Sequence, residues 1–388
     1  QGFGFGHDRV SERRADGGMN TIRKLLLRAV GMVALVVLPM AGVMVMGDGP
    51  IEQYLEFPPQ TRYVEHADFS WAVFMGLGLG ILAVCAPLVV RVIRGGGPKD
   101  GVQGRPIAAR GRWPWWALPA LAGTAIAWVL AWTPIPGLEW VRRFTFSPLW
   151  IGYIGCVSAC TFRRTGRCLL TGRPGRFALL FPLSALFWWF FEYLNRFVQN
   201  WFYFGVQDFS AGEYVMFATL PFATVLPAVM ATRELLWSFP RLRVGLDELP
   251  ELRVAIPRWC GVLVVLSCAA AGLFLIGRFP NQLFPLLWIS PLLVLAALEG
   301  LSGERVPFEE VLRGDWRDAA MLALAALVCG WFWEMWNYFS LAGWEYAVPF
   351  VQRFQVWEMP ILGYAGYLPF GLECGLLARW VLETGGDE

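Results

Sequence analysis

Histidine is almost absent from this 388-residue chain, which contains only His7 and His66. The haem and metal centres of membrane oxygenases are built on several histidines, so a centre of that kind is excluded, and no metal or cofactor is expected. The chain also lacks a Walker A loop, an HExxH motif and a GxSxG motif. It therefore carries none of the sequence signals of a phosphate-binding loop, a zinc protease or a serine hydrolase.

Charged residues are also scarce, because they make up 16% of the chain, against 56% hydrophobic residues. Soluble globular domains contain about a quarter charged residues, so this composition predicts a polytopic membrane protein whose main partner is membrane lipid. The net charge of +2 is too small to indicate a nucleic-acid partner.

The eight cysteines form no CxxC pair, and most of them fall inside apolar segments. None lies in a loop that we expect outside the membrane, where an oxidising compartment favours disulfides. We therefore interpret the cysteines as small core residues.

Ten apolar segments come close to the roughly 20 residues that cross a bilayer core of about 30 Å. They cover residues 25–46, 69–91, 114–134, 145–162, 177–199, 214–236, 259–277, 283–300, 318–340 and 359–380. The predicted fold class is an all-α integral membrane protein with about ten transmembrane helices. Lys and Arg accumulate in cytoplasmic loops, and a cytoplasmic N-terminus puts 26 of the 32 on the inner side. Both termini are therefore predicted in the cytoplasm.

One unusual segment occurs twice in the chain. Residues 189–197 (WFFEYLNRF) and residues 331–339 (WFWEMWNYF) are identical at five of nine positions, at an offset of 142. Other matches lie at an offset of 143, including Trp201 with Trp344 and Tyr203 with Tyr346. Such fixed offsets indicate an internal repeat.

The repeat predicts the organisation of the chain. Two four-helix units with an even number of spans enter the membrane in the same direction, so they are expected to be parallel and related by a pseudo-two-fold axis along the membrane normal. The expected parts are a polar N-terminal tail at 1–24, a two-helix leader with a basic cytoplasmic loop at 25–113, repeat A at 114–256 and repeat B at 257–388.

Each copy of the repeated segment carries a carboxylate and a carboxamide in an apolar run, where ionisable groups are costly. Glu192 with Asn195 and Glu334 with Asn337 are spaced i, i+3, so each pair lies on one helical face. One interpretation is a polar cavity between the repeats. The alternative is that each Glu bonds locally and pins an aromatic outer loop to its helix.

Further residues are candidates for a binding site around these pairs. Arg196 follows Asn195, where the second copy has Tyr338, and could receive an anionic group or extend to the membrane interface. Glu373 lies behind Pro369 and Gly371 in a segment that could be a discontinuous helix. Trp189, Trp331, Trp333 and Trp336 are candidates for an aromatic wall, which would suit a lipid-like ligand. The alternative is that they belong to an aromatic belt at the membrane interface.

Two stretches of the second repeat carry a resemblance. Residues 333–337 (WEMWN) and residues 357–370 (WEMPILGYAGYLPF) resemble uncharacterised polytopic bacterial membrane proteins with WExWN and EMPxLGYxGYxPF motifs. The resemblance covers mainly the last four helices and implies a bacterial cytoplasmic (inner) membrane location, but no activity.

Three functions are expected from these features. The first is binding or transport of a small amphipathic or lipid-like molecule between the two repeats. The second is a membrane-embedded enzyme on a lipid or isoprenoid substrate, with the paired Glu residues as acid and base. The third is an accessory or scaffold subunit, and the membrane helices could also support a homo- or hetero-oligomer. If both Glu/Asn pairs converge on one cavity, the first two are favoured over the third.

Overall fold

The computed structural model describes residues 7–47, 50–58, 61–95, 111–252, 258–301 and 307–382, and most of them are helical. The longer helices are α1 (His7–Met46), α3 (Trp71–Arg94), α4 (Ala117–Trp132), α6 (Phe146–Thr165), α8 (Pro174–Val198), α9 (Ala211–Phe222), α10 (Val225–Trp237), α11 (Arg258–Leu275), α13 (Leu286–Leu301), α15 (Arg317–Tyr338) and α16 (Tyr367–Leu382). Short helical turns are α2 (Glu52–Leu55), α5 (Glu139–Arg142), α7 (Leu169–Gly172), η1 (Pro240–Arg243), α12 (Pro280–Leu283), α14 (Pro307–Leu312) and η2 (Ile361–Gly366).

Six helical stretches of the described residues are long and apolar enough to cross a membrane. They are Ile22–Met46, Trp71–Arg94, Pro174–Val198, Ala211–Trp237, Arg317–Tyr338 and Ile361–Leu382. Ala117–Trp132, Trp259–Leu275 and Leu286–Leu301 are apolar but shorter. The chain is therefore a mostly helical protein of the membrane class, and each of the ten predicted segments contains helix.

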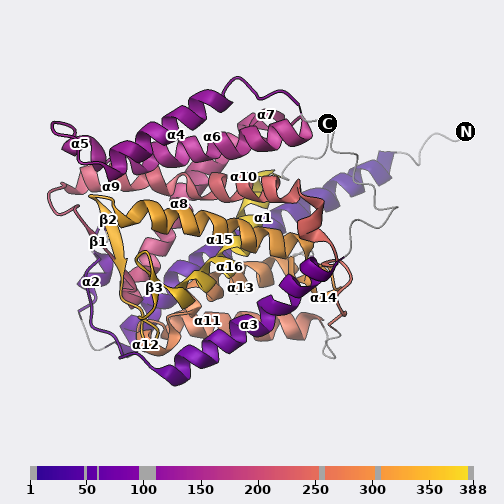
Figure 1. Ribbon diagram of the computed structural model, residues 1–388. Helices are drawn as coiled ribbons and strands as arrows, with labels where there is room; N and C mark the ends of the chain where they lie inside the picture. The colour runs from indigo at the N-terminus through magenta and orange to yellow at the C-terminus, as the bar shows by residue number, and fades with distance from the viewer. Residues whose placement is uncertain are drawn as a thin grey trace, which may run out of the picture.

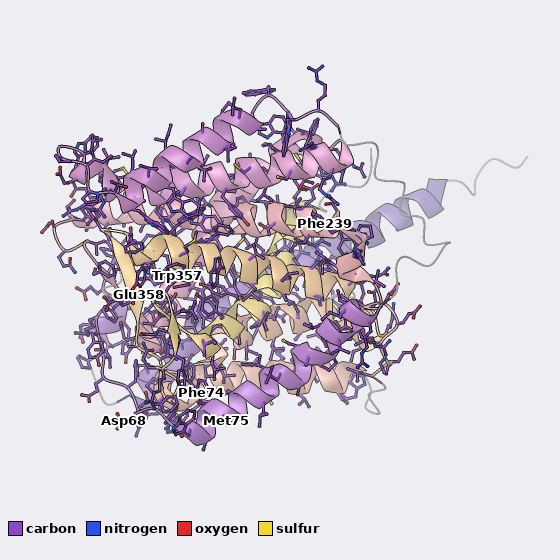
Figure 2. The ribbon with its side chains drawn as sticks, viewed as in Figure 1. Asp68, Phe74, Met75, Phe239, Trp357 and Glu358 are labelled. Carbon is purple, nitrogen blue, oxygen red and sulfur yellow. The ribbon has the colours of Figure 1, made fainter. Side chains whose placement is uncertain are left out.

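The long helices lie side by side in one bundle, with their axes roughly along one direction (Figure 1). α10 is packed against α6, α8, α15 and α16, and α1 lies against α11 and α13. α3 lies at the edge of the bundle, has no buried residue, and contacts η1 and η2. Asp68, Trp357 and Glu358 lie at one end of the bundle and Phe239 at the other (Figure 2).

Two predicted helices are interrupted in the structure. The segment 214–236 forms α9 and α10 with a break at residues 223–224, and Pro227 lacks the N–H that would bond to the Ala223 carbonyl across it. The break also separates the Phe222 carbonyl from the Leu226 N–H. Ser184 of α8 satisfies the freed backbone groups, since its hydroxyl donates to the Phe222 carbonyl (2.6 Å) and accepts from the Leu226 N–H (3.0 Å). The segment 359–380 begins with a strand residue pair and the 3-10 turn η2, and its α-helix starts only at Tyr367.

Strands are the feature that the sequence analysis missed. β1 (Trp201–Phe204) and β2 (Gly343–Tyr346) pair antiparallel, with Trp201 opposite Tyr346 and Tyr203 opposite Trp344. A shorter pair is formed by β3 (Gln355–Val356) and β4 (Met359–Pro360). The β1–β2 pair covers the end of the bundle at which α5, α9 and α12 also lie (Figure 1). The expected outer aromatic loops are therefore a two-stranded sheet that joins two distant parts of the chain.

Candidate functional site

Glu192 lies on α8 with no surface exposed to solvent. Its Oε1 accepts three hydrogen bonds, from Trp188 Nε1 (3.0 Å), Trp201 Nε1 (3.2 Å) and the Tyr203 hydroxyl (2.6 Å). Its Oε2 has no partner among the described residues. The carboxyl group is thus an acceptor on which three donors of aromatic side chains converge.

Glu334 occupies the matching place on α15 and is also fully buried. Its Oε1 accepts from the hydroxyls of Tyr346 and Tyr367, each at 2.7 Å, and its Oε2 has no partner among the described residues. Trp344 Nε1 donates in turn to the Tyr346 hydroxyl (2.7 Å). Both copies therefore place a buried carboxyl group behind a tyrosine of the adjoining strand.

The carboxamides hold these strands. Asn195 Nδ2 donates to the Trp201 carbonyl (2.8 Å), and its Oδ1 accepts from the backbone N–H of Asn200 (2.8 Å) and of Trp201 (3.4 Å). Asn337 repeats the pattern on Trp344, with its Nδ2 on the carbonyl (2.6 Å) and its Oδ1 on the N–H (2.9 Å). Each carboxamide thus bonds to both the backbone N–H and the backbone carbonyl of one strand residue, which ties the strand to the helix that carries the Asn. The Glu/Asn pairs thus pin β1 to α8 and β2 to α15, as the alternative interpretation proposed.

The two copies differ in the residue, other than those of the strand, that donates a hydrogen bond to the carboxyl group. At an offset of 142, Trp188 corresponds to Gly330, and Val225 corresponds to Tyr367. In the second copy the Tyr367 ring lies over Gly330, where an added Cβ would be 2.7 Å from the tyrosine Cζ. In the first copy the further donor is Trp188 of the same helix as the Glu. In the second copy it is Tyr367 of the next helix, and its ring fits only because residue 330 is a glycine.

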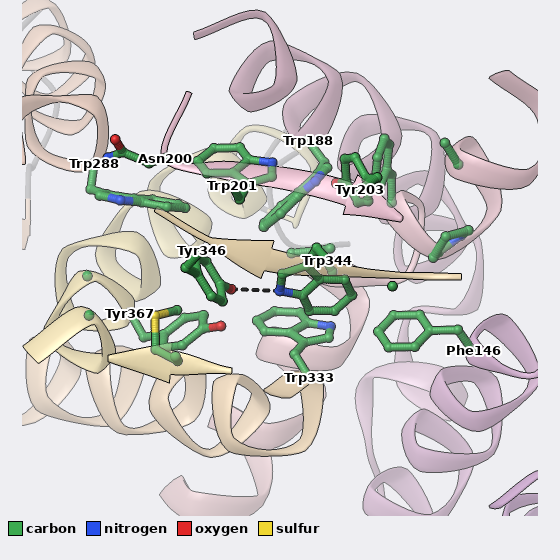
Figure 3. A pocket seen from close by; sticks show the side chains of 18 of the residues that line it. Phe146, Trp188, Asn200, Trp201, Tyr203, Trp288, Trp333, Trp344, Tyr346 and Tyr367 are labelled. Atoms are coloured by element: carbon green, nitrogen blue, oxygen red, sulfur yellow. Dashed lines mark hydrogen bonds between the residues drawn. The ribbon is translucent and has the colours of Figure 1, made fainter. Parts of the chain in front are cut away.

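A cavity of about 610 Å³ lies beneath the β1–β2 pair, between elements of both halves of the chain. Aromatic rings form much of its wall, and five of them are indoles: Trp188, Trp201, Trp288, Trp333 and Trp344 (Figure 3). Tyr203, Tyr346 and Tyr367 line the same cavity, whereas Glu192 and Glu334 do not reach it. The carboxyl groups are thus separated from the cavity by one layer of the tyrosine and tryptophan side chains that bond to them.

Polar groups on the wall are few. Asn200 is 4% exposed, lines the cavity, and has an Oδ1 without a partner among the described residues. Arg143 is the one charged residue among the described residues that line the cavity. Its Nη2 lies 3.5 Å from Asp208 Oδ2, and the Asp208 side chain is 81% exposed. Arg143 is therefore held toward solvent at the rim.

The strand tyrosines stay protonated. Burial, and next the neighbouring Glu192 carboxylate, hold the pKa of Tyr203 well above its usual value of 10. The same causes, with Glu334 as the neighbour, raise the pKa of Tyr346 well above that value. Each hydroxyl therefore remains a donor to its carboxyl group at neutral pH.

The four tryptophans named from the sequence separate in the structure. Trp333 lines the cavity. Trp189 donates from Nε1 to Thr219 Oγ1 (2.9 Å), which ties α8 to α9. Trp331 is 46% exposed, and Trp336 is buried among the rings of other tryptophans. Of these four residues, only Trp333 is placed to meet a ligand in this cavity.

The remaining predicted residues do not lie on the cavity wall. The Arg196 guanidinium donates to the Tyr54 carbonyl oxygen of α2, so it ties α8 to the leader segment. Glu373 of α16 is fully buried, and neither of its carboxyl oxygens has a partner among the described residues. Of the predicted residues, Trp333 therefore lines the cavity, Glu192 and Glu334 lie one side chain behind the lining, and Arg196 and Glu373 lie outside it.

Several lining residues were not among the sequence candidates. Tyr203 and Tyr346 carried a signal, because they match each other at the offset of 143. Trp288 and Asn200 carried none, since they have no counterpart of the same type in the other copy, and Tyr367 was marked only as a position of the GYxGYxPF motif. Comparison of the chain with models of protein families, with curated proteins and with solved structures gives no match.

Proposed function

We propose that this protein binds or transports an amphipathic, lipid-like molecule in the aromatic cavity beneath the β1–β2 pair. The observation that carries the proposal is the cavity itself, because 610 Å³ is in the range of sites for small molecules and its wall is mainly aromatic. A few polar groups, among them Asn200 and the hydroxyls of the lining tyrosines, would orient the polar end of the ligand.

We further propose that the cavity lies between two four-helix repeats of a ten-span protein. The strand register supports this, because exchanging residues at the offset of 143 turns the pair Trp201 and Tyr346 into the pair Trp344 and Tyr203. Phe202 pairs with Glu345, its own counterpart at that offset. A sheet that maps onto itself in this way is what a pseudo-two-fold axis through its centre would produce.

The helix contacts are paired in the same sense. The packing of α4 on α6 has its counterpart in α11 on α13, and the packing of α10 on α15 has its counterpart in α16 on α8. In this proposal α4, α6, α11 and α13 are the four spans beyond the six long ones. Both termini would be cytoplasmic, in a bacterial inner membrane, and the start of α1 and the end of α16 do lie toward the same end of the bundle (Figure 1).

Convergence of the two Glu/Asn pairs favours binding over a scaffold role. The tyrosines bonded to Glu192 and Glu334 line one cavity rather than separate loops. An enzyme with these residues as acid and base is less well supported, since neither carboxyl group lines the cavity and a tyrosine stands in between. Binding without chemistry needs only the wall that is present.

The test is to fill the cavity and measure the retained ligand. Ala218 of α9 lines the cavity, and Ala122 of α4 is exposed on the outside of the bundle. The protein would be purified in mild detergent, and bound amphiphiles would be identified and quantified by mass spectrometry. Ala218→Phe is expected to lower the bound amount, while Ala122→Phe leaves it at the wild-type level. Equal retention by both variants, or no bound amphiphile in the wild type, would contradict the proposal.

A further inference from the structure

The cavity wall carries one charged side chain among the described residues, and it is the cation Arg143. Its Nη2 lies 3.5 Å from Asp208 Oδ2, which is longer than the roughly 2.7–2.9 Å of a strong charge-assisted hydrogen bond. The Asp208 side chain is 81% exposed, and an exposed ion pair of this kind contributes little. The Arg143 guanidinium makes no other hydrogen bond among the described residues. Most of its donors are therefore available to a group in the cavity.

The wall beside Arg143 has two further features that favour a negative charge. α6 begins at Phe146, its first turn lines the cavity, and no side chain caps that turn. The N-terminal end of a helix carries a partial positive charge. Tyr214 of α9 also lines the cavity, and its hydroxyl has no hydrogen-bond partner among the described residues. Tyr214 lies three residues before Phe217, whose ring contacts Phe209 beneath the Arg143 guanidinium.

The opposite side of the cavity carries no charge. Figure 3 shows Phe146 and Trp288 on opposite sides of the cavity. The two sides are built by corresponding segments, because residues 143–146 match residues 286–289 at the offset of 143, and Leu286 stands where the first copy has Arg143. Asn200, beside Trp288, is polar but uncharged (Figure 3). The neighbouring lining residues are apolar, namely Phe284, Pro285 and Ile289.

α3 adds two aliphatic side chains on the uncharged side. Leu77 and Ile81 line the cavity, and α3 packs on η2. Gly366 of η2 lies against Trp288, because an added Cβ would be 3.6 Å from the indole Cδ1. α3 is long and apolar enough to cross a membrane and has no buried residue, so in a bilayer it would contact lipid chains. This side of the cavity therefore suits a hydrocarbon chain rather than a head group.

We propose that the ligand is an anionic amphiphile. Its negatively charged head group, a carboxylate, sulfate or phosphate, binds at Arg143, and its apolar chain lies along the aromatic wall toward Trp288 and α3. The carboxyl groups of Glu192 and Glu334 do not line the cavity, so the head group meets no acidic side chain of the described lining. This inference rests on the proposed function of the same cavity and adds the chemical class of its ligand.

The experiment compares probes with one chain and different head groups. The full-length protein in phosphatidylcholine nanodiscs would be dialysed to equilibrium against dodecyl phosphate, dodecanol or dodecyltrimethylammonium, with empty nanodiscs as the partition blank. We expect saturable binding of dodecyl phosphate, weaker binding of dodecanol and the weakest binding of the cation. Arg143→Gln is expected to weaken dodecyl phosphate about tenfold, the order that the loss of a hydrogen bond to a charged group gives, and to leave dodecanol unchanged.

The matched control removes an arginine that does not line the cavity. Arg353 is exposed on the loop before β3, so Arg353→Gln should leave the affinity for dodecyl phosphate at the wild-type level. Arg143→Lys keeps the charge and should retain most of the affinity. Adding phosphatidylglycerol to the nanodiscs distinguishes two sources of the head group. Displacement of dodecyl phosphate supports a membrane lipid as the ligand, and its retention supports a free single-chain anion.

Dodecanol binding shows whether Arg143→Gln is folded. If that variant binds no dodecanol, Asp208→Asn, which changes an exposed residue, is expected to tighten dodecyl phosphate because the competing carboxylate is gone, and unchanged affinity overturns the charge inference. Equal affinity of wild type and folded Arg143→Gln for dodecyl phosphate, or tighter binding of the cation, also overturns it. The proposed function then stands if Ala218→Phe abolishes dodecanol binding. Saturable binding of no probe overturns both.

Discussion

Replacing Asn337 by alanine removes the clamp between α15 and β2. Two hydrogen bonds to the Trp344 peptide group are lost, at 2.6 and 2.9 Å, and Asn337 is fully buried, so water does not replace them. A net loss of about 1 kcal/mol per bond, with a further cost for peptide groups left unpaired, gives about 2–4 kcal/mol. Because the lost bonds are local, we expect the strand pair to open before the bundle does.

Hydrogen exchange of backbone amides measures this opening directly. A peptide that covers residues 341–348 is expected to exchange about 30-fold faster in Asn337→Ala, the factor that corresponds to roughly 2 kcal/mol. Asn195→Ala should act likewise on residues 200–204, because Asn195 makes three such bonds. The control for the second strand is Asn281→Ala, which removes a contact from α12 to His66 instead and should leave exchange at residues 341–348 unchanged.

The unfolding free energy, measured by denaturation in mild detergent, completes this test. A loss below about 0.5 kcal/mol in Asn337→Ala, the range of ordinary surface substitutions, would refute the reasoning if exchange at residues 341–348 were also unchanged. In that case the strands would be held by their own pairing and by the aromatic packing. The carboxamide of each motif would then need another explanation.

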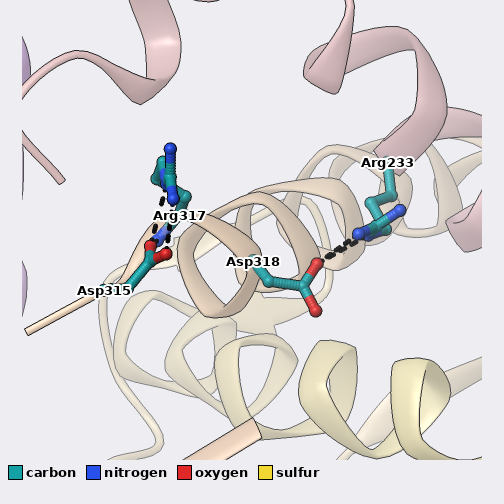
Figure 4. A network of polar contacts seen from close by, with 4 residues as sticks. All are labelled: Arg233, Asp315, Arg317 and Asp318. Atoms are coloured by element: carbon teal, nitrogen blue, oxygen red, sulfur yellow. Dashed lines mark hydrogen bonds and ion pairs between the residues drawn. The ribbon is translucent and has the colours of Figure 1, made fainter. Parts of the chain in front are cut away.

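Gly330→Ala should push Tyr367 away from Glu334, since the added methyl group would meet the tyrosine ring, and the ring is part of a packed core. We expect a loss of about 1–3 kcal/mol in unfolding free energy, with Tyr367→Phe restoring little of it, because the ring and not the hydroxyl is in the way. Asp315 lies at the other end of the bundle, where hydrogen bonds from Arg317 hold its pKa below the usual 3.8 (Figure 4). A lowered pKa means that this stabilisation is present above the unfolded pKa and is lost as the pH falls through the folded pKa. Asp315→Asn should therefore unfold more readily than wild type at neutral pH, and the difference in unfolding midpoint should vanish in acid.

Much of the helical structure was predictable, because a long apolar run leaves few alternatives in lipid. The expected segment 69–91 corresponds to Trp71–Arg94, and 177–199 corresponds to Pro174–Val198. The interrupted segment 214–236 was less predictable. Proline is tolerated in membrane helices where a neighbour satisfies the freed groups, and that neighbour is Ser184, some 40 residues earlier in the chain.

The strand pair could not be predicted from local pattern. Trp201 to Phe204 is four consecutive aromatic residues, too short to show a period of two, and its partner strand begins at Gly343. Its register depends on the helices that carry the two strands. The match of Tyr203 with Tyr346 at one offset was visible, but only the paired strands explain why these two tyrosines recur.

Repetition of the Glu/Asn motif predicts two equal sites, and the contacts explain why the cavity is nevertheless unequal. Both copies keep the carboxyl acceptor and the strand clamp, which depend on residues close to the motif. The added donor comes from Trp188 in one copy and from Tyr367 of the following helix in the other, so the two ends have different walls. Arg196 follows Glu192 by four residues on α8, whereas the matching position of α15 is Tyr338. A ligand that fits one end therefore need not fit the other.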